Sequence, residues 1–476
     1  MPRTWFRSAT VWCWLACAAA LVGTAPPVNG EPLAAHQQFA FDIYKELVEI
    51  NTVTATGDTA RAAAAMASRL RAAGFADSDV HVFTPASRKG NLVARLRGTG
   101  TRKPILLLAH LDVVEARRED WSLDPFKLIE QDGYYYGRGS GDDKFMAAAF
   151  VANLIRYKQE GYRPDRDIIV ALETDEEILD RDGMGIQWLL NNHRDLIDAE
   201  FALNEGGGVG LKHGKPVRNS VQTTEKVSVS FRLEVRNRGG HSSLPTRDNA
   251  IYRLAEGLVR LSKFSFPFKL NDTTRAFFER AAALEGEQTS ADMRAIISGQ
   301  PDLAALSLVR LSANPLYNAQ LRTTCVATML EGGHAINALP QLAAAGVNCR
   351  VLPGESIEEL RATLVRVLAD DQISVTQTHE AVLSAPSALH QEIMGTIEAL
   401  TQEFWPGIPV IPTMSAGATD ASYLRNAGIP TYGHSGLAGD IDDVRAHGRD
   451  ERVLVKSFYD GQEYLYRLVK RLAGGG

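Results

Sequence analysis

Apolar and polar positions follow two different patterns along the chain. Between residues 36 and 210, segments with apolar residues at helical spacing alternate with short, continuous apolar runs. The runs at residues 104–114 and 166–174 are typical of strands that are buried on both faces. Helical spacing marks the segments at residues 36–50, 58–75, 143–161 and 185–197. This alternation predicts an α/β fold with a mostly parallel sheet.

From about residue 222 the pattern changes. Residues 226–238 alternate strictly between apolar and polar side chains, as a half-exposed strand does. Similar strands mix with helical segments until about residue 385, and a continuous apolar run returns only at residues 408–413. We therefore predict an α+β domain over residues 222–383, inserted into a larger domain that occupies residues 31–221 and 384–476.

The first 30 residues follow the order of a secretory signal peptide. Arg3 and Arg7 precede an apolar run at residues 11–22, and small and turn-forming residues come next. The apolar run is short for a membrane span. We therefore expect a secreted or periplasmic protein that has no stable membrane span after processing. If the leader is not cleaved, it anchors the protein to the membrane.

Charge and cysteine usage narrow the function classes. The formal net charge is −6 at pH 7 and no run of lysine or arginine stands out, which argues against a nucleic-acid partner. Beyond the leader, Cys325 and Cys349 lie in two strand-like runs that would face each other in an antiparallel pair. Two interpretations stay open: a disulfide formed after export, or two small buried side chains.

Ionisable side chains stand at the carboxyl ends of the predicted strands, where α/β folds gather ligands. His110 and Asp112 lie inside an otherwise apolar run, and burying them is costly unless something pairs with them. A set of imidazole and carboxylate donors without thiolate suits zinc and, less selectively, cobalt or manganese. The candidate ligands are His110, Asp142, Glu177, Glu205 and His447.

Five protein ligands exceed what one catalytic zinc uses, and they suit two ions roughly 3.5–4 Å apart that share a carboxylate. Asp142 is the expected bridge because its short side chain lies at a loop-to-helix turn. Asp112 is two residues from His110, so it points to the same face of the strand and orients the imidazole. Glu176 is then left beside the ligand Glu177 to act as the general base on a metal-bridging water.

Six short motifs occur in order along the chain: HLDVV, GRGSGDDK, TDEE, NEGG, GGHSSLP and AHGRDER. Together they resemble the dinuclear-zinc amidohydrolase and exopeptidase family. That family includes glutamate carboxypeptidase, carboxypeptidase S, aminoacylase, carnosine dipeptidase, acetylornithine deacetylase and succinyl-diaminopimelate desuccinylase. The resemblance covers nearly the whole mature chain. It implies a zinc exopeptidase-like catalytic domain with an inserted lid domain, and a homodimer formed through that lid.

The resemblance also assigns the metal ligands. It implies that His110 and Glu205 hold one zinc ion, that Glu177 and His447 hold the other, and that Asp142 binds both. Cobalt or manganese would be substitutes.

Further roles follow from the same resemblance. Asp112 would support His110, and Glu176 would be the base. His241, in the lid motif, would stabilise the oxyanion, and in dimeric members it comes from the neighbouring subunit. Arg350 resembles the arginine that grips the substrate carboxylate, a task that suits a guanidinium group. Asn337 matches an asparagine of the same pocket.

These residues together predict an exported zinc-dependent hydrolase that cleaves the amide or peptide bond next to a free carboxylate, as a carboxypeptidase or dipeptidase does. Its substrate would be a small peptide. Two alternatives stay open: a deacylase of N-acyl amino acids that uses the same site, and a non-catalytic binding protein of the same fold. The chain contains no G-x-S-x-G motif, which argues against a serine hydrolase of that type.

Overall fold

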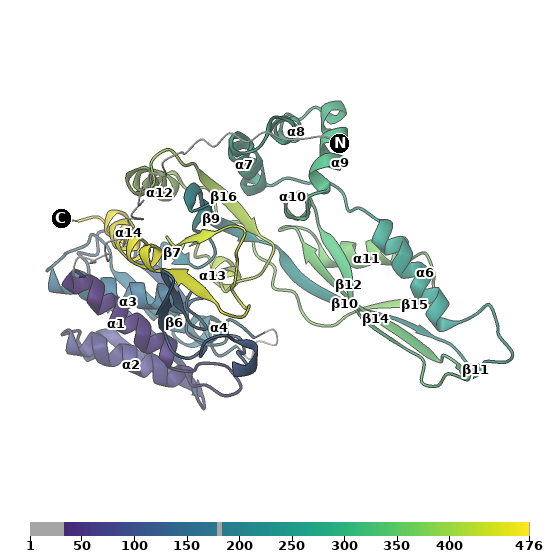
Figure 1. Ribbon diagram of the computed structural model, residues 1–476, viewed down its shortest axis with the longest axis horizontal. Coiled ribbons are helices and arrows are strands. Elements are labelled where there is room, and N and C mark those ends of the chain that lie inside the picture. The colour runs from purple at the N-terminus through teal and green to yellow at the C-terminus, as the bar shows by residue number, and fades with distance from the viewer. Residues whose placement is uncertain (1–32, 179–182, 476) are drawn as a thin grey trace, which may run out of the picture.

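The computed structural model describes residues 33–178 and 183–475. The chain forms a large α/β body and a smaller, elongated body that extends from it (Figure 1). The predicted signal peptide, residues 1–30, lies outside the described residues. Among those that are described, no helix combines the length and apolar character needed to cross a membrane.

The large body is built on a ten-stranded sheet whose central strands run parallel. Its strand order is β1-β2-β6-β3-β7-β17-β9-β8-β18, and β16 pairs with β9. Strands β6, β3, β7 and β17 pair in parallel, whereas β1 and β2 form an antiparallel edge. The strands are β1 (Val80–Ala86), β2 (Lys89–Leu96), β3 (Ile105–His110), β6 (Ile168–Glu173), β7 (Phe201–Asn204), β8 (Val209–Lys212), β9 (Lys215–Glu225), β16 (Val410–Ser415), β17 (Thr431–Gly433) and β18 (Ala438–Asp440).

Both faces of this sheet are covered, which explains the continuous apolar runs. Alternate residues of β3 enter different cores: Leu107 packs into one cluster and Leu106 into the other. The first face carries α1 (Ala35–Glu49), α2 (Thr59–Ala72), α3 (Lys144–Gln159), α12 (Gln391–Phe404) and α14 (Val455–Ala473). The second carries α4 (Ile186–Asn192), α5 (Arg194–Ile197) and α13 (Ala421–Asn426). The predicted α/β class with a mostly parallel sheet is confirmed.

The smaller body, called the lid here, is an antiparallel sheet of order β12-β14-β10-β15 with its own core. Strand β10 (Val227–Arg236) has alternating burial, as its sequence predicts. The other strands are β12 (Thr324–Gly332), β14 (Leu342–Val351) and β15 (Ile373–Gln377), and α6 (Ala250–Lys263) and α11 (Ile357–Leu368) pack on them. A small sheet of β11 (Gly240–His241) and β13 (Ala338–Leu339) forms the far tip (Figure 1).

A group of helices inside the predicted lid range packs on the large body instead. It comprises α7 (Asp272–Ala281), α8 (Glu287–Ile297), α9 (Pro301–Ser312) and α10 (Pro315–Leu321). Its core includes Phe277, Phe278 and Ile411, and Ile411 belongs to strand β16. Strand β9 also continues in the large sheet to Glu225, so the chain enters the lid at Lys226. The domain bounds drawn from the sequence stay a prediction.

A fourth sheet has three strands and packs into the core of the large body. Its order is β19-β5-β4, with β4 (Ile129–Gln131), β5 (Tyr134–Tyr136) and β19 (Arg452–Leu454). Arg452 pairs with Tyr136, so residues 137–142 lie beside the chain that precedes β19. Two segments that are more than 300 residues apart in sequence are thereby brought together.

The two cysteines of the lid form a disulfide. Cys325 on β12 and Cys349 on β14 are direct partners in the antiparallel register. The sequence left open whether these cysteines form a disulfide or are two small buried side chains, and the structure contains the disulfide. The bond ties the edge strand of the lid to its neighbour.

Candidate dinuclear metal centre

Five ionisable side chains meet at one edge of the large sheet because the strands that carry three of them are parallel neighbours. His110 ends β3, Glu177 follows β6 and Glu205 follows β7. Asp142 comes just before α3, and His447 lies in the loop between β18 and β19. The carboxyl ends of parallel strands share an edge, and that edge is where α/β sheets bind ligands.

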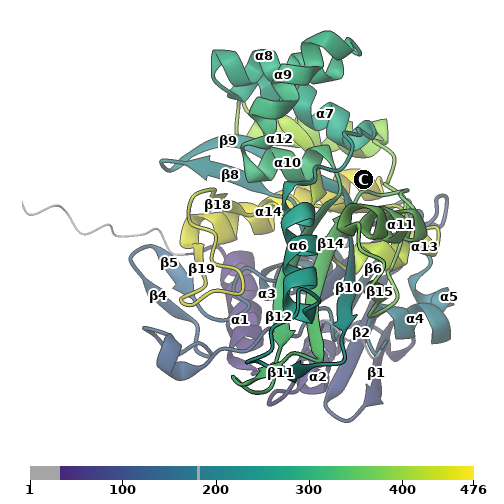
Figure 2. The same cartoon turned by 90° about the vertical axis from the view of Figure 1, so that its right-hand side faces the viewer.

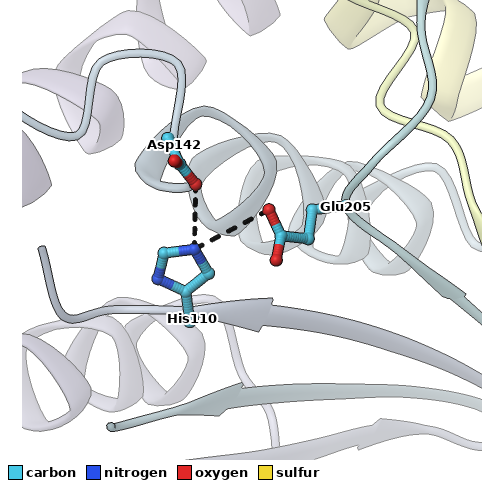
Figure 3. A group of neighbouring side chains, drawn as sticks. All are labelled: His110, Asp142 and Glu205. Atoms are coloured by element: carbon cyan, nitrogen blue, oxygen red, sulfur yellow. Dashed lines mark hydrogen bonds and ion pairs between the residues drawn. The ribbon is translucent and has the colours of Figure 1, made fainter. Parts of the chain in front are cut away.

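The first group of donors is shown in Figure 3. The Nε2 atom of His110 lies 3.1 Å from Oδ1 of Asp142 and 3.9 Å from Oε2 of Glu205. The three donor atoms all lie within 4.8 Å of one another. His110 is buried, whereas the two carboxylates are partly accessible, so the group faces solvent from the strand end.

The second group shares Asp142 with the first. The Nε2 atom of His447 lies 3.1 Å from Oδ2 of Asp142 and 2.9 Å from Oε2 of Glu177. These three donors also lie within 4.8 Å of one another. Asp142 therefore offers one carboxylate oxygen to each group, which is the geometry of a bridging ligand.

The charges at this edge suit divalent cations. Burial raises the pKa of Glu205, and the nearby carboxylates of Glu176 and Asp142 raise it further. Hydrogen bonds to Asp142 and then to Glu177 raise the pKa of His447 to about 10. The negative charge of several neighbouring carboxylates is balanced here only by the protons of two imidazoles. Divalent cations that replace those protons balance the charge better and stabilise the group. The donor set of two imidazoles and three carboxylates fits such ions.

Asp112 organises the centre in a way that differs from the expectation. The Nδ1 atom of His110 donates to the backbone carbonyl of Asp112 at 3.0 Å, while the nearer carboxylate oxygen is 3.8 Å away. This bond leaves Nε2 free to bind a metal. The Asp112 carboxylate instead accepts the backbone N–H groups of Glu176 at 3.2 Å and Glu177 at 3.1 Å. Burial, opposed by His110, raises its pKa to about 6.

Glu176 stands directly before the candidate ligand Glu177, in the segment that follows β6. Asp112 holds its backbone, and its charge raises the pKa values of both His110 and Glu205. Glu176 belongs to neither three-residue group, whereas its neighbour Glu177 belongs to the second. Its role as the base stays a prediction.

The lid residues are separated from the metal centre of the same chain. His241 and Asn337 lie together at the tip, where the backbone N–H of Ser242 donates to the carbonyl of Asn337 at 3.0 Å. Strand β11, which contains His241, is at the end of the lid that points away from the α/β body (Figure 1). His241 is exposed. Within one chain, the structure does not bring these two residues to the ligands, and their roles stay predictions.

Arg350 lies at the other end of the lid. It is opposite Ser228 in the register of β10 and β14. Ser228 is two residues after Lys226, where the chain enters the lid. It is half-buried, burial lowers its pKa, and its Nε donates to Oδ1 of Asn348 at 3.2 Å. A half-buried guanidinium is suited to hold a carboxylate, and that role also stays a prediction.

Sequence reasoning missed a buried ion pair next to the centre. Nη1 of Arg138 lies 2.8 Å from Oε2 of Glu451, and each side chain is 3% exposed. Both residues stand inside motifs that were recognised, GRGSGDDK and AHGRDER. Their charge and their closeness to Asp142 and His447 in sequence were the available signals.

Comparison with known proteins gives consistent findings. Residues 106–471 match the model described as peptidase family M20/M25/M40. "Probable carboxypeptidase S-like 2" of Dictyostelium discoideum is 30% identical over 379 residues, which cover 77% of this chain and 71% of that protein. The human "N-fatty-acyl-amino acid synthase/hydrolase PM20D1" is 28% identical over 378 residues, which cover 77% of this chain and 74% of that protein.

A solved structure extends the likeness to the fold. The M20 family metallo-carboxypeptidase Sso-CP2 from Sulfolobus solfataricus superposes with a TM-score of 0.66 at 16% identity, covering 90% of this chain and 98% of that one. The large ten-stranded sheet and the lid of this chain are thus arranged as in a solved structure of that family.

Proposed function

This chain belongs to peptidase family M20/M25/M40 and is a metal-dependent peptidase or amidohydrolase, and from that premise we propose that it cleaves the amide bond next to a free carboxylate. The family resemblance inferred from six motifs is confirmed, and the alternative of a non-catalytic binding protein is set aside. The observation that carries the proposal is the pair of three-residue groups that share Asp142.

We propose zinc as the metal in both groups. Mixed imidazole and carboxylate donors without thiolate are typical of catalytic zinc. His110 and Glu205 would hold one ion, Glu177 and His447 the other, and Asp142 both. What such ions supply is polarisation of the scissile carbonyl and a lower pKa of the attacking water.

The protein's own groups then handle the proton and the substrate. Glu176 takes the proton of the attacking water and later delivers it to the leaving amine. Asp112 keeps Glu176 and Glu177 in place by accepting both backbone N–H groups. Arg350 binds the substrate carboxylate, and His241 stabilises the developing oxyanion from a second copy of the chain.

Peptides and N-acyl amino acids share the amide next to a free carboxylate, so both classes are substrates to test. The relatives support both, since one is called a probable carboxypeptidase S-like protein and the other an N-fatty-acyl-amino acid synthase/hydrolase. We favour small peptides, with N-acyl amino acids as the second candidate. The test is a panel of dipeptides and N-acyl amino acids assayed with zinc, with a chelator, and after zinc is restored. Hydrolysis that persists unchanged in the chelator would contradict the proposal.

The surface of the lid supports a homodimer. Strand β12 is the sheet edge, and most of its side chains are exposed, as are apolar residues of α6 beside it. An open, apolar edge strand is a template for pairing with another strand. The exposed apolar side chains are Ile251, Tyr252, Val259, Val326, Met329 and Leu330. Figure 2 shows α6 and β12 side by side on the lid.

We also propose that the protein is exported. Residues 1–30 have the order of a signal peptide, and the Cys325–Cys349 disulfide agrees with an oxidising compartment. Mass spectrometry of the protein purified from its native host tests this. A cleaved leader supports export, whereas an intact leader on a cytosolic protein contradicts it.

A further inference from the structure

The carboxylate of Glu451 receives four hydrogen bonds from the segment that ends in the shared ligand. Its Oε1 accepts the backbone N–H of Gly141 at 2.8 Å and of Asp142 at 3.2 Å. Its Oε2 accepts the backbone N–H of Gly139 at 3.1 Å and Nη1 of Arg138 at 2.8 Å. An ionised carboxylate has about four acceptor positions. Glu451 is therefore fully used in holding the loop and does not act as a sixth metal ligand.

Arg138 connects this carboxylate to the other side of the centre. Its Nη2 donates to the backbone carbonyls of His447 and Glu115, each at 3.3 Å. Its guanidinium also lies over the ring of Trp121, with 5.1 Å to the ring centroid. The pair thus contacts the backbone of two ligands, one in the shared position and one in the second group.

The fold gives this pair its place. Strand β19 begins directly after Glu451 and pairs with β5, and the backbone N–H of Gly137 donates to the carbonyl of Glu451 at 3.1 Å. The loop then turns at Gly139, which has a φ of 79°. A Cβ at that position would come within 2.7 Å of Cγ1 of Val113, and the positive φ would strain any residue with a side chain, so the turn favours glycine.

We propose that Glu451 and Arg138 are positioning residues of the metal centre, with Glu451 fixing the shared ligand Asp142 and Arg138 fixing His447. The inference rests on the proposed function, because it concerns the ions that the hydrolase would use. The two residues act unequally. Loss of Glu451 disturbs both ions through Asp142, whereas loss of Arg138 disturbs mainly the ion held by Glu177 and His447.

The experiment titrates metal-free protein with cobalt(II), following visible absorption and the heat of binding. Wild-type protein should bind two equivalents. Glu451→Gln keeps the shape but turns an amide NH2 group toward backbone donors, so both ions should bind at least tenfold more weakly, with altered absorption bands. Arg138→Lys keeps the charge but loses the fork that reaches His447, so one ion should keep its affinity while the second weakens by about tenfold.

A matched control separates positioning from general stability. Glu225 forms another buried ion pair, with Arg425 at 3.1 Å, and each side chain is again 3% exposed. Its other bonds go to Gln222 and Thr419 and to no metal ligand. Glu225→Gln should therefore bind two cobalt ions with wild-type affinity and wild-type absorption bands, even if its unfolding temperature falls.

The outcomes are decisive for both proposals. If the two variants are folded by circular dichroism and bind both ions with wild-type affinity, the inference is wrong. If Glu451→Gln does not fold, Arg138→Lys decides, and unchanged binding of the second ion overturns the inference. If wild-type protein binds two ions but hydrolyses no member of the substrate panel, the proposed function fails while the positioning role stands.

Discussion

At the residue scale, two adjacent glutamates are assigned different work. Oε2 of Glu177 lies 2.9 Å from Nε2 of His447 and belongs to a candidate ligand group, whereas Glu176 belongs to neither group and is the proposed base. Glu176→Gln should lower kcat by about 10²–10⁴-fold, the usual contribution of a general base, while metal content stays at two ions. The measurement combines steady-state kinetics with metal analysis by mass spectrometry.

The variant to compare with Glu176→Gln is His447→Ala, which removes a proposed metal ligand. That variant should lose metal content first and activity as a consequence. Equal metal loss in the two variants would mean that Glu176 is a ligand and not the base.

His434 provides a residue-scale prediction about pH. It is buried, its Nε2 faces the Tyr464 hydroxyl at 2.8 Å, and burial lowers its pKa to about 4. The folded state resists protonation that the unfolded state accepts near pH 6.5, so this residue costs stability as the pH falls from 6.5 to 4. Over that range the wild type should lose about 3 kcal/mol at most relative to His434→Gln.

Urea unfolding of chelated protein at pH 7 and pH 4.5 measures this difference. Chelation matters because metal release would add its own pH dependence. The same pH dependence in wild type and variant would rule out His434 as the source.

The grouping of the five candidate ligands could be predicted from the sequence because most of them stand at recognisable places. His110, Glu177 and Glu205 lie at or just after buried strands, and parallel strands bring such ends together. The contacts of Glu451 with Gly139 and Asp142 could not be predicted from the sequence. They depend on the pairing of β5 with β19, which local periodicity does not encode.

At the element scale, the alternation over residues 226–238 predicted β10 well because one face of that strand is buried and the other half-exposed. The same reasoning did not recognise that α7–α10 pack on the catalytic sheet. The apolar faces of these helices show that they pack in a core but not in which body. Their contact with Ile411 joins segments that are far apart in sequence, so local periodicity does not reveal it.

The disulfide gives a prediction for the lid strands. It links residues 24 apart, and in the chain-entropy model a loop of this length adds about 3 kcal/mol to stability. The double variant Cys325→Ala/Cys349→Ala should lower the stability of the lid by about that amount and leave cobalt binding unchanged, since neither residue belongs to a candidate ligand group. Limited proteolysis reports the lid, and cobalt titration reports the centre.

Reduction of wild-type protein supplies the control for that experiment. It should reproduce the protease sensitivity of the double variant. Weakened metal binding in the double variant would show instead that lid and centre are coupled.

At the scale of the whole molecule, the position of His241 calls for a second chain. The residue lies at the tip of the lid, away from the ligands of its own chain (Figure 1). If it serves a partner's centre, Glu176→Gln and His241→Ala homodimers should each be nearly inactive. Mixed after unfolding and refolding in equal amounts, they should regain about a quarter of wild-type activity, because half of the dimers are mixed and each has one complete site.

Light scattering sets the condition for that experiment. Wild-type protein should be a dimer, and Leu330→Lys on the exposed edge strand should shift it toward the monomer and lower activity with it. A fully active monomer, or refolded mixtures no more active than their parts, would place the oxyanion donor within one chain.

The packing of α7–α10 has a consequence for protein engineering. Phe277 and Phe278 share a core with Ile411 of β16. The hydroxyls of Thr223 and Thr273 are hydrogen-bonded at 2.7 Å, and Gln320 donates to the carbonyl of Met414 at 2.8 Å. Excising residues 227–377 as one piece would strip that cover and leave β16 bare. A minimal hydrolase without the lid would therefore have to keep residues 272–321, which cover β16 of the large sheet. New linkers would have to join these residues to the chain where the lid strands had been.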